Sequence, residues 1–184
     1  MDDVIYASLP LGVMAAARAS QGDKEAVRFY LEELQRLLLK TSNGWAFGMT
    51  LQNAGFNLQY NYHRYEAAKA LYQGSLVLWR EIQGVESGFS IVRGLIGLAE
   101  IAAIQGQGER SGWLFGAADH LTPSSSFYRD ALNERVAQTR KQLDAATAAT
   151  FEAAWAEGQA ATLEQAIDKA LREDAAMNDY RVAP

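Results

Sequence analysis

The sequence predicts an all-α chain, a right-handed helical-hairpin solenoid with a C-terminal helical cap, and three observations support this prediction. Apolar residues recur at helical spacing over most of the chain, and no segment shows the period-two alternation that is typical of strands. Similar helix pairs recur, with Leu11, Leu51 and Leu95 at corresponding positions 40 and 44 residues apart. A Pro- and Ser-rich run at residues 122–126 then ends the repeat.

Residues 122–126 also mark the expected boundary between the two parts of the chain. Proline stops a helix and serine caps the next one, so we expect three hairpins in residues 1–122 and capping helices in residues 123–184. The last repeat of a solenoid exposes an apolar side unless other helices cover it. We therefore interpret the C-terminal helices as a cap.

The first hairpin is expected to consist of helices over residues 4–20 and 24–40. Pro10 interrupts the first of these and either kinks the helix or marks its beginning. The pattern breaks at Gln21-Gly22, after which Asp23 is suited to cap the N-terminus of the second helix.

The central hairpin follows a turn at residues 41–44. We expect its helices over residues 51–60 and 65–82, joined by the polar turn at residues 61–64. Gly84 is suited to the left-handed position that ends the second of these helices.

Breaks in the apolar periodicity predict where the helices of the third hairpin and of the cap begin and end. Gly106-Gln107-Gly108 separates the two helices of the hairpin, and Thr162 followed by Gln165 fits the capping box that begins a helix. The expected helices cover residues 86–105, 109–121, 127–143, 146–157 and 163–174.

Composition excludes several classes of function. The net charge is −5, so there is no general attraction to nucleic acid or to anionic membranes. The absence of cysteine excludes disulfides, thiolate metal sites and cysteine nucleophiles. The N-terminus lacks the positive charge of a secretory signal, and no apolar run approaches the length of a membrane span. We therefore expect a soluble, cytoplasmic protein with no cofactor, no metal and no direct contact with nucleic acid or membrane.

Basic residues between 127 and 144 alternate with acidic ones. Such mixed charge favours an exposed helix over a nucleic-acid patch. The basic residues are Arg129, Arg135, Arg140 and Lys141, and the acidic ones are Asp130, Glu134 and Asp144.

Two short patterns invite catalytic or nucleotide-binding interpretations. Asp119-His120 lies close in sequence to the serines at 124–126, but adjacent helical residues point about 100° apart, so Asp119 is poorly placed to orient His120. Gly106-Gln107-Gly108 with Gly112 has the glycines of a dinucleotide loop without the preceding strand, which favours a helix-hairpin turn. We therefore expect no enzyme.

Several segments carry a resemblance to a known family. They lie between about Leu11 and Leu171, and they are similar to tetratricopeptide repeats (TPR) of the long variety. The chain most resembles the C-terminal sensor region of bacterial signalling ATPases and of LuxR-type or maltose-activator-type transcription regulators. The matching segments are residues 51–55, 65–68, 71–78, 94–99, 105–107, 114–118, 151–158 and 163–166.

The resemblance implies a non-enzymatic binding module that docks a peptide or partner protein within such a regulator. The alternative that it implies is a domain that senses a small-molecule inducer. No phosphate loop and no basic recognition helix occur in the sequence, so we expect either a fragment of a larger regulator or a free-standing relative of its sensor region. An apolar stripe on residues 1–20 favours a homodimer or a domain-swapped contact through that segment.

The resemblance also implies where a ligand binds. In tetratricopeptide repeats the first helix of each hairpin faces the groove, and the matching positions are Gln52, Asn53, Phe56, Gln59, Arg93, Glu100 and Ile104. Asparagine and glutamine offer donors and acceptors for a peptide backbone or a polyhydroxylated ligand. Phe56 and Tyr60, four residues apart, either form a ligand platform or pack between repeats. Arg93 and Glu100 either contact the ligand or only solvate their helix.

Overall fold

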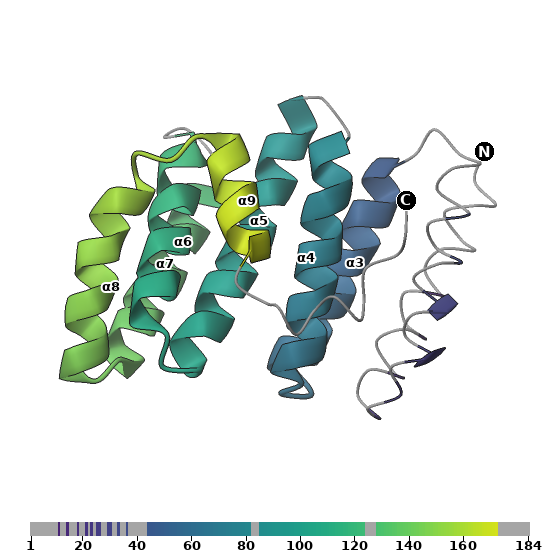
Figure 1. Ribbon diagram of the computed structural model, residues 1–184, viewed down its shortest axis with the longest axis horizontal. Coiled ribbons are helices and arrows are strands. Elements are labelled where there is room, and N and C mark those ends of the chain that lie inside the picture. The colour runs from purple at the N-terminus through teal and green to yellow at the C-terminus, as the bar shows by residue number, and fades with distance from the viewer. Residues whose placement is uncertain are drawn as a thin grey trace. The chain divides into compact units, whose positions relative to one another are not determined.

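The computed structural model describes residues 44–81, 85–123 and 128–172, with individual residues between Leu11 and Arg36; for residues 44–47, 81 and 85–89 it describes the backbone alone. Helices and no strands occur in this part of the chain, which confirms the all-α prediction there (Figure 1). The right-handed solenoid remains a prediction. None of the described helices combines the length and apolar character needed to cross a bilayer. The helices are α3 (Gly44–Tyr60), α4 (Tyr65–Glu81), α5 (Val85–Ile104), α6 (Gly108–Leu121), α7 (Tyr128–Gln142), α8 (Ala145–Gly158) and α9 (Leu163–Arg172).

The chain forms two compact units. The first contains α3 and α4, and the second is Gly88–Arg172, with most of α5 and all of α6 to α9. The predicted boundary near residue 122 lies within the second unit. The division into three hairpins and a cap therefore remains a prediction.

Several expectations concern residues outside the described part of the chain. These are most of the helix over residues 4–20, including Pro10, most of the dimer contact through residues 1–20, the cap at Gly84 and the serines at 124–126. Asp23 is described, and its Oδ1 accepts a hydrogen bond from the backbone N–H of Ala26 at 3.0 Å. This is the contact expected of an N-cap residue.

The α3–α4 hairpin has the turn that the sequence predicts at residues 61–64. The N–H of Arg64 donates to the carbonyl of Leu58 at 2.8 Å, and His63 adopts a positive φ of 52° to reverse the chain. Its core contains Leu58 from α3 and Leu76 and Trp79 from α4, all almost fully buried. Apolar burial between the two helices therefore stabilises the hairpin.

The helix α3 begins at Gly44, earlier than the predicted start at residue 51. Gly48 does not break the helix, because its missing side chain makes room for an indole. A Cβ at this position would lie 2.5 Å from Cε2 of Trp79. The close packing of Trp79 thus outweighs the low helix propensity of glycine.

Glycines bring α6 and α8 into backbone contact in the second unit. Gly108, Gly112 and Gly116 follow one another at four-residue intervals on α6, so they share one helix face. A Cβ at Gly112 would lie 2.0 Å from the carbonyl oxygen of Phe151, and one at Gly158 would lie 2.1 Å from that of Trp113. No larger residue fits at these positions without moving the helices apart.

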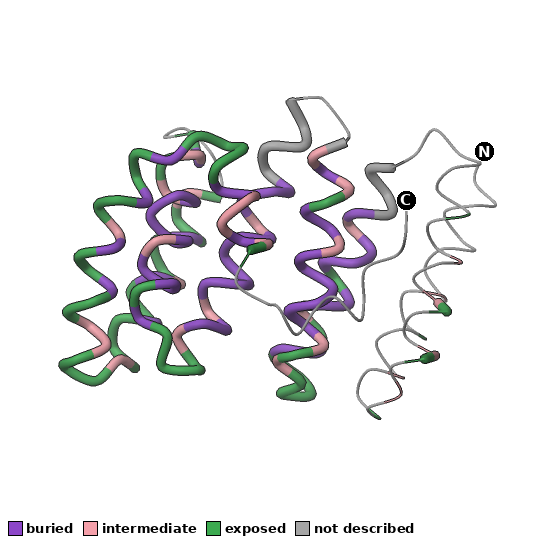
Figure 2. Tube along the Cα trace, in the orientation of Figure 1, coloured by how far each residue is buried: buried purple, intermediate pink, exposed green. Residues whose placement is uncertain are grey.

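Aromatic side chains fill the space beside this contact. Phe115 and Phe151 are fully buried, with ring centroids 6.0 Å apart, and Trp155 stacks on Phe115 at 6.4 Å. Figure 2 shows that α6 is buried along most of its length, whereas α8 buries only a few residues. The helix α6 is therefore central to the second unit.

Arginine side chains tie α5 and α9 to the rest of this unit. Arg110, which is 7% exposed, donates to the carbonyl of Ala170 in the last turn of α9 at 3.0 Å. Arg135 of α7 donates two hydrogen bonds to Glu100 of α5, at 2.9 and 3.0 Å. Because charge-assisted bonds of this kind are directional, they orient the helices as well as attract them.

Three local features that the sequence predicts in the second unit are confirmed. Gly106, with φ 72°, lies in the turn between α5 and α6, so the glycine-rich pattern is a helix-hairpin turn. Thr162 and Gln165 form the capping box, with N–H to oxygen distances of 2.9 and 3.3 Å. The mixed-charge helix α7 is largely exposed, as predicted, and buries only Leu132, Val136 and Thr139.

We predict that Gly112→Ala destabilises the second unit by about 1–3 kcal/mol or more, because its methyl group would force α6 away from the α8 backbone. Gly74→Ala is the control, since a Cβ there meets only Leu51 Cδ1 at an ordinary 3.7 Å. In urea unfolding the control should be neutral or slightly stabilising. Equal stability of the Gly112→Ala variant and wild type would show that the helices tolerate separation.

We also predict a pH dependence that originates at Asp144, the N-cap of α8. Hydrogen bonds from the backbone N–H and side chain of Thr147 lower the pKa of its carboxyl below the ordinary 3.8. The unfolded chain keeps the ordinary pKa, so this stabilisation is complete above pH 3.8 and is lost as the pH falls through the lowered pKa. Asp144→Asn keeps a capping oxygen but does not titrate. Its free energy of unfolding should therefore fall less steeply with acidification than that of wild type, and parallel profiles would contradict the prediction.

Candidate functional site

The seven predicted ligand residues occupy different environments, and Ile104 is exposed at the end of α5. Gln52 and Gln59 are buried inside the α3–α4 hairpin. Gln52 Nε2 donates to the hydroxyl of Ser75 at 3.4 Å, and Gln59 Oε1 accepts from the hydroxyl of Tyr72 at 3.0 Å. These two amides thus connect α3 to α4, and they face the interior of the hairpin.

Asn53 is exposed on the outer face of α3 and Phe56 is half-buried at the edge of that face, beside residues one and two turns further on. Asn57 Nδ2 donates to the carbonyl of Asn53 at 3.1 Å, and Asn61 Nδ2 donates to Asn57 Oδ1 at 2.8 Å. The rings of Phe56 and Tyr60 lie beside this ladder, with centroids 4.5 Å apart. We call these five residues the amide–aromatic stripe.

The stripe is accessible to a partner. Its asparagines and Tyr60 are exposed and Phe56 is half-buried, whereas Leu51, Ala54 and Leu58 on the inner face of α3 are buried. Sequence reasoning named Asn53, Phe56 and Tyr60 but missed Asn57 and Asn61. Their signal was the four-residue spacing of the three asparagines, which places them on one helix face.

Arg93 and Glu100 lie on α5 in the second unit. Both are half-buried, and Glu100 binds Arg135 through two hydrogen bonds. Within the described structure Glu100 therefore has a clear role in holding α7 against α5. The role of either residue in ligand binding remains a prediction.

Asp119 and His120 are not arranged as an acid–base pair. Arg129 forms an ion pair with Asp119 Oδ1 and also donates to the carbonyl of Asp119 at 2.9 Å, while Gln159 Nε2 donates to Asp119 Oδ2 at 2.8 Å. Both carboxylate oxygens are thus engaged by residues other than His120, which is exposed near the end of α6. This network joins the C-terminal end of α6 to α7 and to the end of α8.

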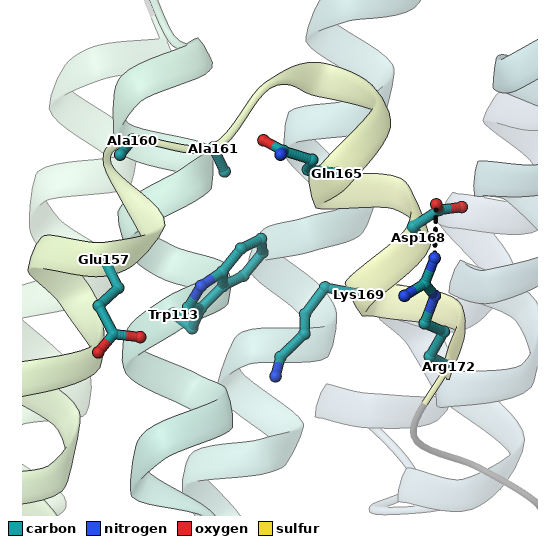
Figure 3. A pocket seen from close by; sticks show the side chains of 8 residues that line it. All are labelled: Trp113, Glu157, Ala160, Ala161, Gln165, Asp168, Lys169 and Arg172. Carbon is teal, nitrogen blue, oxygen red and sulfur yellow. Dashed lines mark hydrogen bonds and ion pairs between the residues drawn. The ribbon is translucent and has the colours of Figure 1, made fainter.

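A pocket of about 380 Å³ lies in the second unit, between α6, the end of α8 and α9 (Figure 3). The half-buried indole of Trp113 lies between the side chains of Glu157 and Lys169. Lys169 Nζ is 5.9 Å from the centroid of the Trp113 ring. The remaining lining residues are Ala160, Ala161, Gln165, Asp168 and Arg172.

Sequence reasoning did not find this pocket. Trp113, Glu157 and Lys169 come from three helices, so no periodicity or motif in the sequence connects them. The residues that the structure describes contain no group of three His, Asp or Glu side chains placed to hold a metal ion.

Comparison of the chain with family models, with curated proteins and with solved structures finds no match in any of the three. The amide–aromatic stripe and the Trp113 pocket are therefore the features from which a function is inferred.

Proposed function

We propose that the chain is a non-enzymatic binding module that holds an extended peptide of a partner protein against the amide–aromatic stripe. The observation that carries this proposal is the exposed ladder of Asn53, Asn57 and Asn61 beside the rings of Phe56 and Tyr60. The proposal also draws support from the resemblance to tetratricopeptide-repeat sensor regions. On that basis we assign the module to a bacterial signalling or transcription regulator.

The spacing of the ladder suits an extended backbone. Residues four apart on a helix are separated by about 6 Å along its axis. Alternate residues of an extended chain are separated by about 6.6 Å, and their backbone groups point in the same direction. Successive asparagines can therefore meet successive outward-facing peptide groups over two turns of α3.

The chemistry of the ladder suits the same ligand. An asparagine amide offers two N–H donors and two acceptor lone pairs. Asn57 uses one N–H toward Asn53 and one lone pair toward Asn61, so it keeps one of each for a peptide N–H and carbonyl. The ladder also holds the amides in place before binding, which lowers the entropic cost of ordering them.

The two rings supply the apolar part of the surface. Phe56 and Tyr60 are in contact with each other, and Tyr60 is exposed while Phe56 is half-buried. Aromatic residues of this kind dominate the binding energy of many interfaces. We expect the bound peptide to place an apolar side chain against this pair.

The stripe contains no ionisable side chain at neutral pH. A peptide held by amides and rings does not depend on charge attraction, so its affinity should change little with salt concentration. This property separates the proposed mode from recognition of acidic or basic segments, whose affinity falls as salt is added.

The test begins with selection of random linear peptides on the full-length chain, followed by fluorescence anisotropy with the selected peptide. We predict that Asn57→Ala and Phe56→Ala each weaken binding at least about tenfold, or ~1.4 kcal/mol, because each removes a direct contact. The melting temperature of Asn57→Ala should change little, since this side chain is exposed.

Val77→Ala is the matched control, because Val77 is an exposed apolar residue of α4 outside the stripe. This variant should bind the peptide as wild type does. The proposal fails if no peptide is selected, or if the selected peptide binds the Asn57→Ala variant and wild type equally.

A further inference from the structure

The Trp113 pocket has the dimensions of a small-molecule site and lies in a different unit from the stripe on α3. Its volume of about 380 Å³ is within the range of about 300–1,000 Å³ that is typical of ligand pockets. The half-buried indole of Trp113 forms its apolar surface, and the short side chains of Ala160 and Ala161 leave space beside the indole (Figure 3). A planar ring of a ligand can therefore stack on Trp113.

The two cationic side chains that line the pocket are both engaged within the protein. Arg172 forms an ion pair with Asp168 at 3.1 Å. Lys169 has partners of its own in the protein, and its Nζ lies 5.9 Å from the centroid of the Trp113 ring, within reach of a cation–π interaction. A cationic ligand on the same indole would place a second positive charge near this ammonium group. The pocket therefore favours a neutral ring.

Glu157 supplies the polar group that remains for a ligand. Its side chain is exposed at the end of α8 and makes no hydrogen bond or ion pair with any residue in the described ranges. It lines the pocket on the side of Trp113 opposite Lys169 (Figure 3). An ionised carboxylate only accepts hydrogen bonds, and its two oxygens can accept from two parallel N–H groups at once. The pocket thus offers a stacking surface with a two-point acceptor next to it.

We propose that this pocket binds a guanine-type base, a neutral planar ring with two adjacent N–H donors on one edge. The base stacks on Trp113, and its ring N–H and exocyclic amino group donate to the two oxygens of Glu157. Hypoxanthine lacks the amino group and loses one of these bonds, while adenine turns an acceptor nitrogen toward the carboxylate. The carboxylate therefore distinguishes guanine from both of these purines.

Two backbone contacts hold the stacking surface and the acceptor in place before binding. Gly158 packs against Trp113 so closely that a Cβ there would lie 2.1 Å from the Trp113 carbonyl oxygen, which fixes the backbone of the preceding residue, Glu157, beside the indole. The connection from α8 to α9 is held by the capping box, in which the N–H of Thr162 donates to Gln165 Oε1 at 2.9 Å. A site held in this way spends less free energy on ordering its backbone when the ligand binds.

The experiment titrates the full-length chain with guanosine, inosine and adenosine. All of these carry the same ribose, so a difference in affinity reports on the base alone. Binding is followed through the indole N–H resonances of the four tryptophans, with Trp113→Phe identifying the signal of Trp113. We expect guanosine to shift the Trp113 signal saturably, with a dissociation constant on the order of 0.1 mM. Inosine and adenosine should each bind at least about tenfold more weakly.

Variants of α8 assign the acceptor. Glu157→Gln should weaken guanosine binding at least about tenfold, because glutamine keeps only one acceptor oxygen. It should also reduce the preference for guanosine over inosine, which a loss of packing alone would not do. Glu152→Gln, at an exposed position of α8 outside the pocket, is the matched control and should leave both affinities unchanged. Circular dichroism verifies that every variant folds.

A single-stranded trinucleotide with guanosine at its centre separates a free nucleoside from a nucleic acid as the source of the base. The net charge of the chain is −5, which disfavours a polyanion, so we assign the pocket to the free nucleoside. The trinucleotide should therefore bind no more tightly than guanosine. Tighter binding that weakens as salt is added would overturn this assignment.

Three results would overturn the inference of a guanine site. The first is the absence of a saturable Trp113 shift with guanosine at roughly ten times the expected dissociation constant. The second is equal affinity for guanosine and either inosine or adenosine. The third is unchanged guanosine affinity in the Glu157→Gln variant. None of these results bears on the peptide proposal, whose residues lie on α3 and whose measurement is peptide anisotropy.

Discussion

The backbone contact between α6 and α8 is the constraint on which the second unit depends. Four glycines let the two helices approach until each lies against the carbonyl oxygens of the other. The contact between Gly158 and the Trp113 carbonyl also decides where the pocket forms, because Glu157 precedes Gly158 and is thereby brought to the indole. The aromatic core of Phe115, Phe151 and Trp155 then fills the space beside the contact. The close contact between α6 and α8 thus both packs the second unit and positions the lining of the Trp113 pocket.

Charged residues of the second unit divide into two groups. Arg110, Arg129 and Arg135 bind carbonyl or carboxylate oxygens of neighbouring helices, and the structure uses them to hold helix ends and helix pairs together. Glu157 and Lys169 instead line the pocket. Partial burial strengthens the first group, since water competes less well for buried charge-assisted bonds.

On α3, the position of an amide side chain around the helix decides whether that side chain is buried or exposed. Gln52 and Gln59, seven residues apart, occupy the buried face and bond to α4, whereas Asn53 and Asn57 occupy the exposed face. An amide buried beside Ser75 or Tyr72 has an internal partner, which reduces the cost of taking it from water. The exposed amides bond along the helix and keep capacity toward solvent. One helix thus contributes both to the interior of the hairpin and to the proposed peptide surface.

The sequence by itself determined the elements whose signals are local. The turn at residues 61–64, the glycine turn around Gly106, the capping box at Thr162 and the exposed helix α7 depend on residues close together in the chain. Only the tertiary structure decided which faces meet. Glycine carries no apolar signal, so the packing role of Gly112 does not appear in a hydrophobic pattern. Gln52 and Asn53 are both polar amides in the sequence, and only the packing of α4 shows that Gln52 is the buried one. The pocket required the meeting of Trp113, Glu157 and Lys169 from three helices, because helical periodicity specifies a face but not the neighbour that covers it.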